Sequence, residues 1–130
     1  MIQAYAKWMG IAIVLIGILG LVFGEGSLFG LVNIDVVEDI VHLLTGGLMA
    51  YAGFANLDLA FMKAVVGGVG VAYLLVGVLG FVTPTLFGLL PHGYSVFDNI
   101  LHLALGAVGI AMAWFVGSRP MSPSRTSATR

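Results

Sequence analysis

Four long apolar stretches, separated by short segments rich in Gly, Pro, Asn and Asp, dominate the chain. They run over about residues 4–23, 36–54, 59–82 and 96–116. Each is close to the roughly 20 apolar residues that a helix needs to cross a bilayer. The link at 55–58 is so short that the second and third helices should be antiparallel neighbours. The pattern predicts an all-α integral membrane protein with four transmembrane helices.

The second half of the chain repeats the first at a spacing of about 60 residues. The run Ile18–Val22 resembles Val78–Val82, and Asp39–Leu43 resembles Asn99–Leu103. Each copy holds two predicted helices, so both copies should have the same topology, related by an axis along the membrane normal. The repeat predicts two tandem helical hairpins of the same topology.

These hairpins define the predicted domain organisation. The first repeat covers 4–54, the second covers 61–116, and a four-helix domain takes in residues 1–117. The segment 118–130 is rich in Ser, Pro and Arg, a composition that predicts a basic, disordered tail.

Composition agrees with a membrane protein. Hydrophobic residues make up 60% of the chain and charged residues 8%, against about 25% charged residues in soluble domains. The five basic residues lie in the first turns of the first helix, near the middle link or in the tail. They are Lys7, Lys63, Arg119, Arg125 and Arg130. By the positive-inside rule both termini should be cytoplasmic, with a bacterial inner membrane as the predicted location. The absence of cysteine excludes disulfides, and the absence of a basic surface argues against nucleic acid as a partner.

Glycine recurs inside the predicted helices, where lipid offers no hydrophobic drive for association and close backbone approach supplies the packing. The candidate packing positions are Gly20, Gly24, Gly46, Gly77, Gly80, Gly106 and Gly109. Packing among the four helices is the favoured interpretation, and docking onto other membrane protein subunits is the alternative.

Two helices begin with a pattern of oxygen-bearing residues. Asp35 and Ser95 lie just before the two helices, and Glu38 and Asp98 follow three residues later at the third helical position, as in a capping box. Acidic groups also suit the positive end of the helix dipole. Helix capping is therefore the simplest interpretation of all four residues.

Capping does not explain the two histidines that follow. His42 lies four residues after Glu38, and His102 lies four residues after Asp98, so each shares a helix face with its carboxylate. A hydrogen-bonded staple between helices is the favoured interpretation. The alternatives are a zinc or iron site formed by these four residues, axial ligation of haem or chlorophyll, and a proton or ion entry site.

One part of the repeat resembles a known family. The run from Asp98 to Gly106, together with Phe87-Gly88-Leu89, is similar to the bacterial family called "domain of unknown function 4383". The first copy departs from this pattern, with Glu38-Asp39 before the histidine and Thr45-Gly46-Gly47 after it. The resemblance implies a four-helix membrane fold and no particular activity.

The chain has no Ser/His/Asp set, HExxH motif or phosphate-binding loop, so it is predicted not to be an enzyme. The leading functional hypothesis is an accessory or scaffold subunit of a larger photosynthetic or respiratory membrane complex, in contact with the lipid bilayer. A haem-, chlorophyll- or metal-binding protein that uses His42 and His102 is the second hypothesis. A small-solute or proton channel is the third, and the lack of charged residues at the middle of the helices counts against it.

Overall fold

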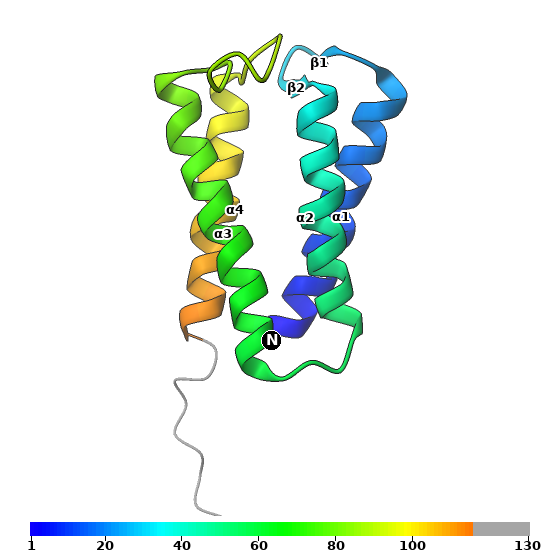
Figure 1. The fold of residues 1–130 in the computed structure, drawn as a ribbon, viewed down its shortest axis with the longest axis vertical. Helices are drawn as coiled ribbons and strands as arrows, with labels where there is room; N and C mark the ends of the chain where they lie inside the picture. Colours follow the sequence, from blue (N-terminus) through cyan, green and yellow to red (C-terminus); the bar gives the residue numbers. More distant parts are fainter. Residues whose placement is uncertain (116–130) are drawn as a thin grey trace, which may run out of the picture.

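The structure is a computed structural model, and it describes residues 1–115. Its elements are α1 (Ile2–Phe23), β1 (Gly26–Leu28), β2 (Val32–Ile34), α2 (Val36–Phe54), α3 (Leu59–Val82) and α4 (Val96–Phe115). The helices run up and down as two neighbouring pairs, α1 with α2 and α3 with α4 (Figure 1). The predicted tail and the last residues of the predicted domain lie outside the described residues.

Each helix pair is held together through its own glycines. A Cβ atom added to Gly46 of α2 would lie 2.7 Å from the Val14 nitrogen of α1, and one added to Gly77 of α3 would lie 2.8 Å from the Leu103 nitrogen of α4. At such distances a side chain cannot fit, so glycine is what allows these backbones to touch. Of the other five predicted packing glycines, four contact the partner helix: Gly20, Gly80, Gly106 and Gly109. A Cβ atom added to Gly24 would have nothing within 4 Å, and this residue instead ends α1 with a φ of +84°.

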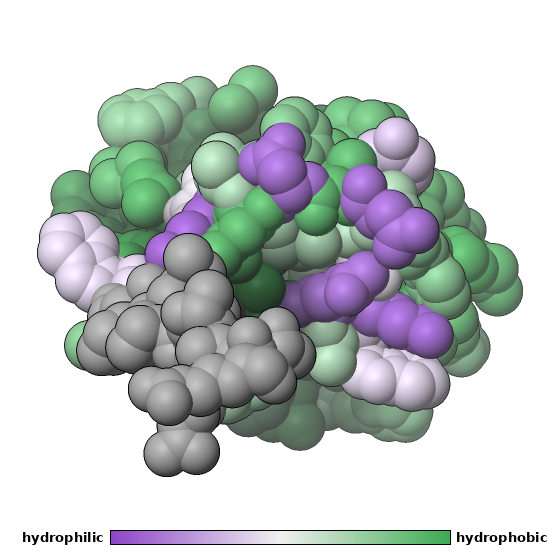
Figure 2. Space-filling model, turned by 90° about the horizontal axis from the view of Figure 1, so that it is seen from below, coloured by the Kyte–Doolittle hydropathy of each residue, from purple (hydrophilic) through white to green (hydrophobic). Residues whose placement is uncertain are grey.

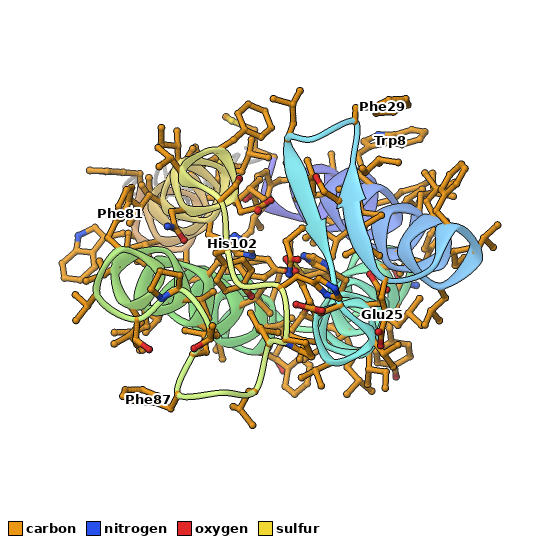
Figure 3. All side chains as sticks on the ribbon, turned by 90° about the horizontal axis from the view of Figure 1, so that it is seen from above. Trp8, Glu25, Phe29, Phe81, Phe87 and His102 are labelled. Carbon is orange, nitrogen blue, oxygen red and sulfur yellow. The ribbon has the colours of Figure 1, made fainter. Side chains whose placement is uncertain are left out.

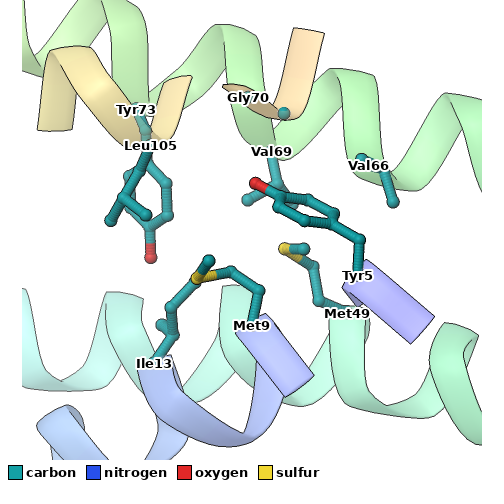
Figure 4. Close-up of a pocket in the computed structure, with 10 residues that line it drawn as sticks. Tyr5, Met9, Ile13, Met49, Val66, Val69, Gly70, Tyr73 and Leu105 are labelled. Carbon is teal, nitrogen blue, oxygen red and sulfur yellow. The ribbon is translucent and has the colours of Figure 1, made fainter. Parts of the chain in front are cut away.

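The two pairs meet along a seam of larger side chains. Met49 of α2 faces Val66, Val69 and Tyr73 of α3 across a small cavity of about 10 Å³ (Figure 4). All four side chains are at most 8% exposed. The seam therefore relies on flexible and aromatic side chains rather than on close backbone contact.

At one end of the bundle lie the segments 24–35 and 83–95, which we call the loop end. The segment 24–35 is more than a connecting loop, because β1 and β2 pair antiparallel in it, with Ser27 opposite Asn33. The strands are joined through Phe29 and Gly30, both with positive φ. At the opposite end are the N-terminus and the link between α2 and α3, where the Asp58 side chain caps α3 by accepting a hydrogen bond from the Phe61 amide at 2.8 Å.

Three of the four helices, α1, α3 and α4, are long and apolar enough to cross a membrane. The remaining helix, α2, has 19 residues and carries Glu38, Asp39 and His42 in its first two turns. Seen from the end that holds the N-terminus, hydrophilic side chains gather toward the middle and hydrophobic ones surround them (Figure 2). The apolar helices fit a lipid environment.

Candidate functional site

The two histidines come together near the loop end, between the helix pairs. The His42 ring on α2 and the His102 ring on α4 stack with their centroids 6.0 Å apart and an interplanar angle of 18°. Figure 3, viewed from the loop end, shows His102 near the centre of the bundle. Tyr73 of α3 meets the His102 ring edge-on at 5.3 Å. Residues separated by a whole repeat in the sequence thus share one buried site.

The hydrogen bond made by His102 fixes the tautomer of its ring. Its Nδ1 atom lies 2.7 Å from the backbone carbonyl oxygen of Asp98. Since a carbonyl oxygen only accepts, Nδ1 must carry the proton, and Nε2 of the neutral ring must carry a lone pair. That Nε2 atom lies 4.0 Å from Oε1 of Glu38. A ring nitrogen with a lone pair therefore lies near a carboxylate oxygen, which is an arrangement that suits a shared cation.

Glu38, like His102, uses one of its two polar side-chain atoms in a hydrogen bond and leaves the other without one. Its Oε2 atom accepts a hydrogen bond of 2.9 Å from the side-chain amide of Asn33, whereas Oε1 is buried without a partner among the described residues. Nδ1 of His42 is buried and unpartnered in the same sense. Glu38, His42 and His102 each offer one ligand atom, and these atoms lie within 4.8 Å of one another. The three side chains are at most 9% exposed.

Asp98, the fourth residue of the predicted metal set, is not part of this group. Its Oδ2 atom accepts hydrogen bonds from the backbone amides of Ser95 at 2.9 Å and Asn33 at 3.0 Å. The Ser95 hydroxyl in turn accepts from the Asp98 amide at 3.1 Å. Ser95 and Asp98 thus form the reciprocal bonds of a capping box at the start of α4. The carboxylate is committed to backbone donors, which explains why it leaves the ligand group.

The first helix start behaves differently from the prediction. Asp35 is the residue before α2, yet its side chain makes no capping hydrogen bond. Instead it accepts from the Asn33 side chain at 2.8 Å and pairs with Nδ1 of His92 at 2.7 Å. The predicted capping box of Asp35 and Glu38 is therefore wrong, because the Asn33 side chain donates to both carboxylates and His92 also binds Asp35.

These contacts set the ionisation of Asp35. Burial alone would raise its pKa, but the hydrogen bonds from His92 and Asn33 hold the pKa below the ordinary value of 3.8. Asp35 is therefore a charged anchor for the segment 83–95. Nearby, burial also raises the pKa of Tyr94, whose ring packs on His102 at 5.0 Å. Tyr94 thus remains a neutral hydroxyl that covers the site.

The loop end buries more negative than positive groups. Asp35, Glu38, Asp39 and Asp98 are each at most 3% exposed. Within residues 1–115 the lysines lie toward the other end, where Lys7 contacts Gly53 and the Phe54 ring. Buried charges are normally paired or bound to a metal ion. Within residues 1–115 no lysine or arginine pairs with these carboxylates, and the side chains that pair with them there are histidines.

Asn33 and His92 are the site residues that sequence patterns missed. Asn33 lies in a strand of three residues, and His92 lies in an irregular segment beside Pro91. Neither position belongs to a helical period or a spaced motif. Apart from the contact between Asn33 and Asp35, which are two residues apart, their hydrogen bonds join residues 5 to 65 positions apart in the sequence, so only the folded loop end reveals them.

Comparison of the chain with protein-family models, with curated proteins and with solved structures finds no match. The resemblance to the bacterial family of unknown function therefore stays a prediction. The site is interpreted from its own geometry.

Proposed function

We propose that this protein binds one divalent transition-metal ion through Glu38, His42 and His102 in the membrane. The observation that carries the proposal is the convergence of three buried side chains, each with one possible ligand atom within 4.8 Å of the others, and Glu38 Oε1 and His42 Nδ1 have no hydrogen-bond partner among the described residues. Two imidazoles and one carboxylate are a donor set that zinc and ferrous iron both accept. The excess of buried carboxylates at the loop end supplies the charge that a dication would balance.

The surroundings support a metal rather than a simple staple. Metal-bound histidines usually donate their second ring N–H to a carbonyl or carboxylate, as His102 donates to Asp98. Glu38 is likewise oriented by Asn33. Zinc–ligand bonds of about 2.0–2.1 Å place tetrahedral ligands about 3.3 Å apart, so side chains now within 4.8 Å need to close by only about 1–1.5 Å.

The same proposal includes the membrane architecture. Four transmembrane helices, with α2 crossing beside α1, would form two hairpins of the same topology, and repeated contacts support this arrangement. Asp39 of α2 meets Gly20 of α1, and Asn99 of α4 meets Gly80 of α3. With both termini cytoplasmic, as in a bacterial inner membrane, the metal would lie near the outer face. The ion would then join one hairpin to the other.

A macrocycle has less support at this site than an ion. The pocket beside the histidines has a volume of about 130 Å³, whereas pockets for drug-sized ligands start at about 300 Å³. Haem and chlorophyll therefore rank below zinc or iron as ligands of His42 and His102.

The accessory-subunit hypothesis is the second candidate. Phe29 and Phe87, at 88% and 82% exposed, protrude from the loop end on opposite sides (Figure 3), which suits contact with a neighbouring subunit or with lipid. The glycine ridges that suggested docking are used within the hairpins, however, as Gly20 and Gly109 show. The channel hypothesis has less support, because the cavity that lies between the helix pairs and includes Tyr73 in its lining has a volume of only about 10 Å³.

The proposal is tested by metal titration of the purified protein in detergent. After chelation and dialysis, the wild-type chain should take up one Co²⁺ or Zn²⁺ per chain, and Co²⁺ should give the visible d–d bands of a site with nitrogen and oxygen ligands. His102→Ala should weaken Co²⁺ binding by more than about 100-fold, beyond the roughly 10–100-fold loss typical when a residue that only hydrogen-bonds to a metal ligand is removed.

His92→Ala is the matched control, because His92 lies at the same end, is 44% exposed and is outside the ligand group. It should retain Co²⁺ binding within a few-fold. A folded wild-type protein that binds neither ion, or a His92→Ala variant that loses binding as completely as His102→Ala, would overturn the proposal.

A further inference from the structure

The loop end carries the same tight turn twice. The sequence Leu-Phe-Gly-Leu stands at 28–31 and again at 86–89. In each copy the backbone amide of the last Leu donates a hydrogen bond to the carbonyl oxygen of the first, at 3.1 Å in 28–31 and 3.3 Å in 86–89. The two central residues have a positive φ in both copies, 56° and 72° in the first turn and 62° and 92° in the second. Two segments far apart in the sequence thus adopt the same kind of turn, with Phe at its first central position.

Phe is an unusual residue for this position. Turns with a positive φ at both central residues are dominated by Gly, Asn and Asp, because the Cβ atom of other residues is crowded in that conformation. Packing inside the protein does not account for the choice, since Phe29 and Phe87 are 88% and 82% exposed. A small or polar residue would suit the turn better, yet a large apolar ring stands there twice. The rings are therefore placed for an apolar contact outside the chain.

The direction and the level of the two rings agree with a contact to lipid. Phe29 and Phe87 project outward from opposite sides of the loop end (Figure 3). With 22 and 24 residues, α1 and α3 are about 33 and 36 Å long. The hydrocarbon core of a bilayer is about 30 Å thick, so helices of this length end in the interfacial layer just beyond it. Turns that project sideways at this level reach the lipid around the bundle.

Placement and charge favour acyl chains over other partners. One neighbouring subunit can cover only one side of the bundle, whereas lipid surrounds both sides. The segments 24–35 and 83–95 contain no Lys or Arg, and Glu25 is exposed, so no permanently charged base attracts anionic head groups to these turns. The contact that remains for the two rings is an apolar one.

We propose that Phe29 and Phe87 are lipid anchors. Each ring enters the leaflet at the loop end and contacts acyl chains below uncharged head groups. The anchors hold the turns 28–31 and 86–89 against the membrane and so fix the level of the bundle in it. This inference rests on the membrane-crossing helices of the proposed architecture, and it does not depend on a bound metal ion.

Site-directed spin labelling tests the proposal, because the chain contains no cysteine and each introduced one is unique. Leu31→Cys and Leu89→Cys place a nitroxide label beside the rings without replacing them, at positions that are 54% and 63% exposed. The full chain is reconstituted in phosphatidylcholine vesicles, and electron paramagnetic resonance measures collisions of the label with lipid-soluble oxygen and with a water-soluble nickel chelate. Both labels should lie at a depth of about 5–10 Å, as apolar side chains of interfacial segments do.

Substitution of the rings shows whether they cause this depth. Phe29→Asn introduces a residue that tolerates a positive φ, so the turn should persist while the label at Leu31→Cys moves into water. Phe29→Leu keeps an apolar side chain and is the matched control, in which the label should stay in lipid. Phe87→Asn should bring the label at Leu89→Cys into water in the same way.

Two reference positions make every outcome decisive. Ser27→Cys is the reference for water, because Ser27 is exposed and lines an open polar pocket at the loop end. Val71→Cys is the reference for lipid, because Val71 is 47% exposed in the middle of α3. The inference is wrong if the labels at 31 and 89 collide with nickel as the Ser27→Cys label does, if protein shields them from both reagents, or if they keep their depth in the Asn variants. If the Val71→Cys label also lies in water, the proposed membrane architecture fails as well.

Discussion

Two adjacent glycines of α2 allow a sharp test of how the hairpins are packed. A Cβ atom at Gly46 would lie 2.7 Å from the Val14 nitrogen, 2.9 Å from Cγ2 of Ile13 and 3.0 Å from the Gly10 oxygen, all on α1. A Cβ atom at Gly47 would have nothing within 4 Å outside its own helix. The substitutions Gly46→Ala and Gly47→Ala thus change the same chemistry at neighbouring positions that face different surroundings.

The expected free energies follow from two opposing effects. Alanine in place of glycine favours a helix by up to about 1 kcal/mol, and this gain applies at both positions. Overpacking a close contact costs about 1–3 kcal/mol, and only Gly46→Ala incurs it. Because two of the three contacted atoms are backbone, rotamer changes cannot relieve the clash. We expect Gly47→Ala to stabilise the protein slightly and Gly46→Ala to be less stable than Gly47→Ala by about 1–3 kcal/mol.

The assay is reversible unfolding in mixed micelles of dodecylmaltoside and sodium dodecyl sulfate, followed by circular dichroism. Both variants have the same composition, so detergent binding to the unfolded state should be nearly the same for each. If their unfolding free energies agree within about 0.5 kcal/mol, the spread of neutral surface substitutions, then close contact between α1 and α2 does not hold the hairpin together.

Two further predictions concern the loop end. The pKa of Asp35 is lowered on folding, so its ionised form contributes stability above pH about 4, and this contribution is lost as the pH falls through the folded pKa. Thermal unfolding of the wild type should therefore show a loss of stability in acid. Asp35→Asn should start from a lower stability and lose less of it in acid. Ser95→Ala removes the cap on α4 and the 2.6 Å hydrogen bond donated to the Leu31 carbonyl, so it should cost about 1–2 kcal/mol in the same micelle assay, with Ser95→Thr recovering most of the loss.

Hydrophobic runs and turn residues predict the helices well. The bounds expected for the second and third helices, 36–54 and 59–82, are those of α2 and α3. Among the four helices, α2 is long enough to cross a membrane but not apolar enough, because its first turns carry the polar residues of the site. The polar residues that contribute to the candidate site thus lower the hydropathy of α2.

The candidate site is predictable only in part. Helical spacing placed Glu38 and His42 on one face, and the repeat suggested that His102 shares their depth; the structure brings all three together. Asp98 does not join the ligand group, because it accepts hydrogen bonds from the backbone amides of Ser95 and Asn33. Asn33 lies 65 residues away, so helical spacing does not predict this contact. The role of Asn33 likewise arises from a short strand pair whose placement is set by tertiary contacts.

The close packing within each helix pair has a consequence for synthesis. Because α1 and α2 meet through their own glycines, the first hairpin can be complete before α3 and α4 are made. About 60 residues separate His42 from His102, and at about 5–20 residues per second the ribosome needs about 3–12 s to add them. During that interval the face of α2 that carries Glu38 and His42 has no second hairpin to cover it. Glu38 and His42 therefore lack the third residue of their group, His102, until the second hairpin arrives.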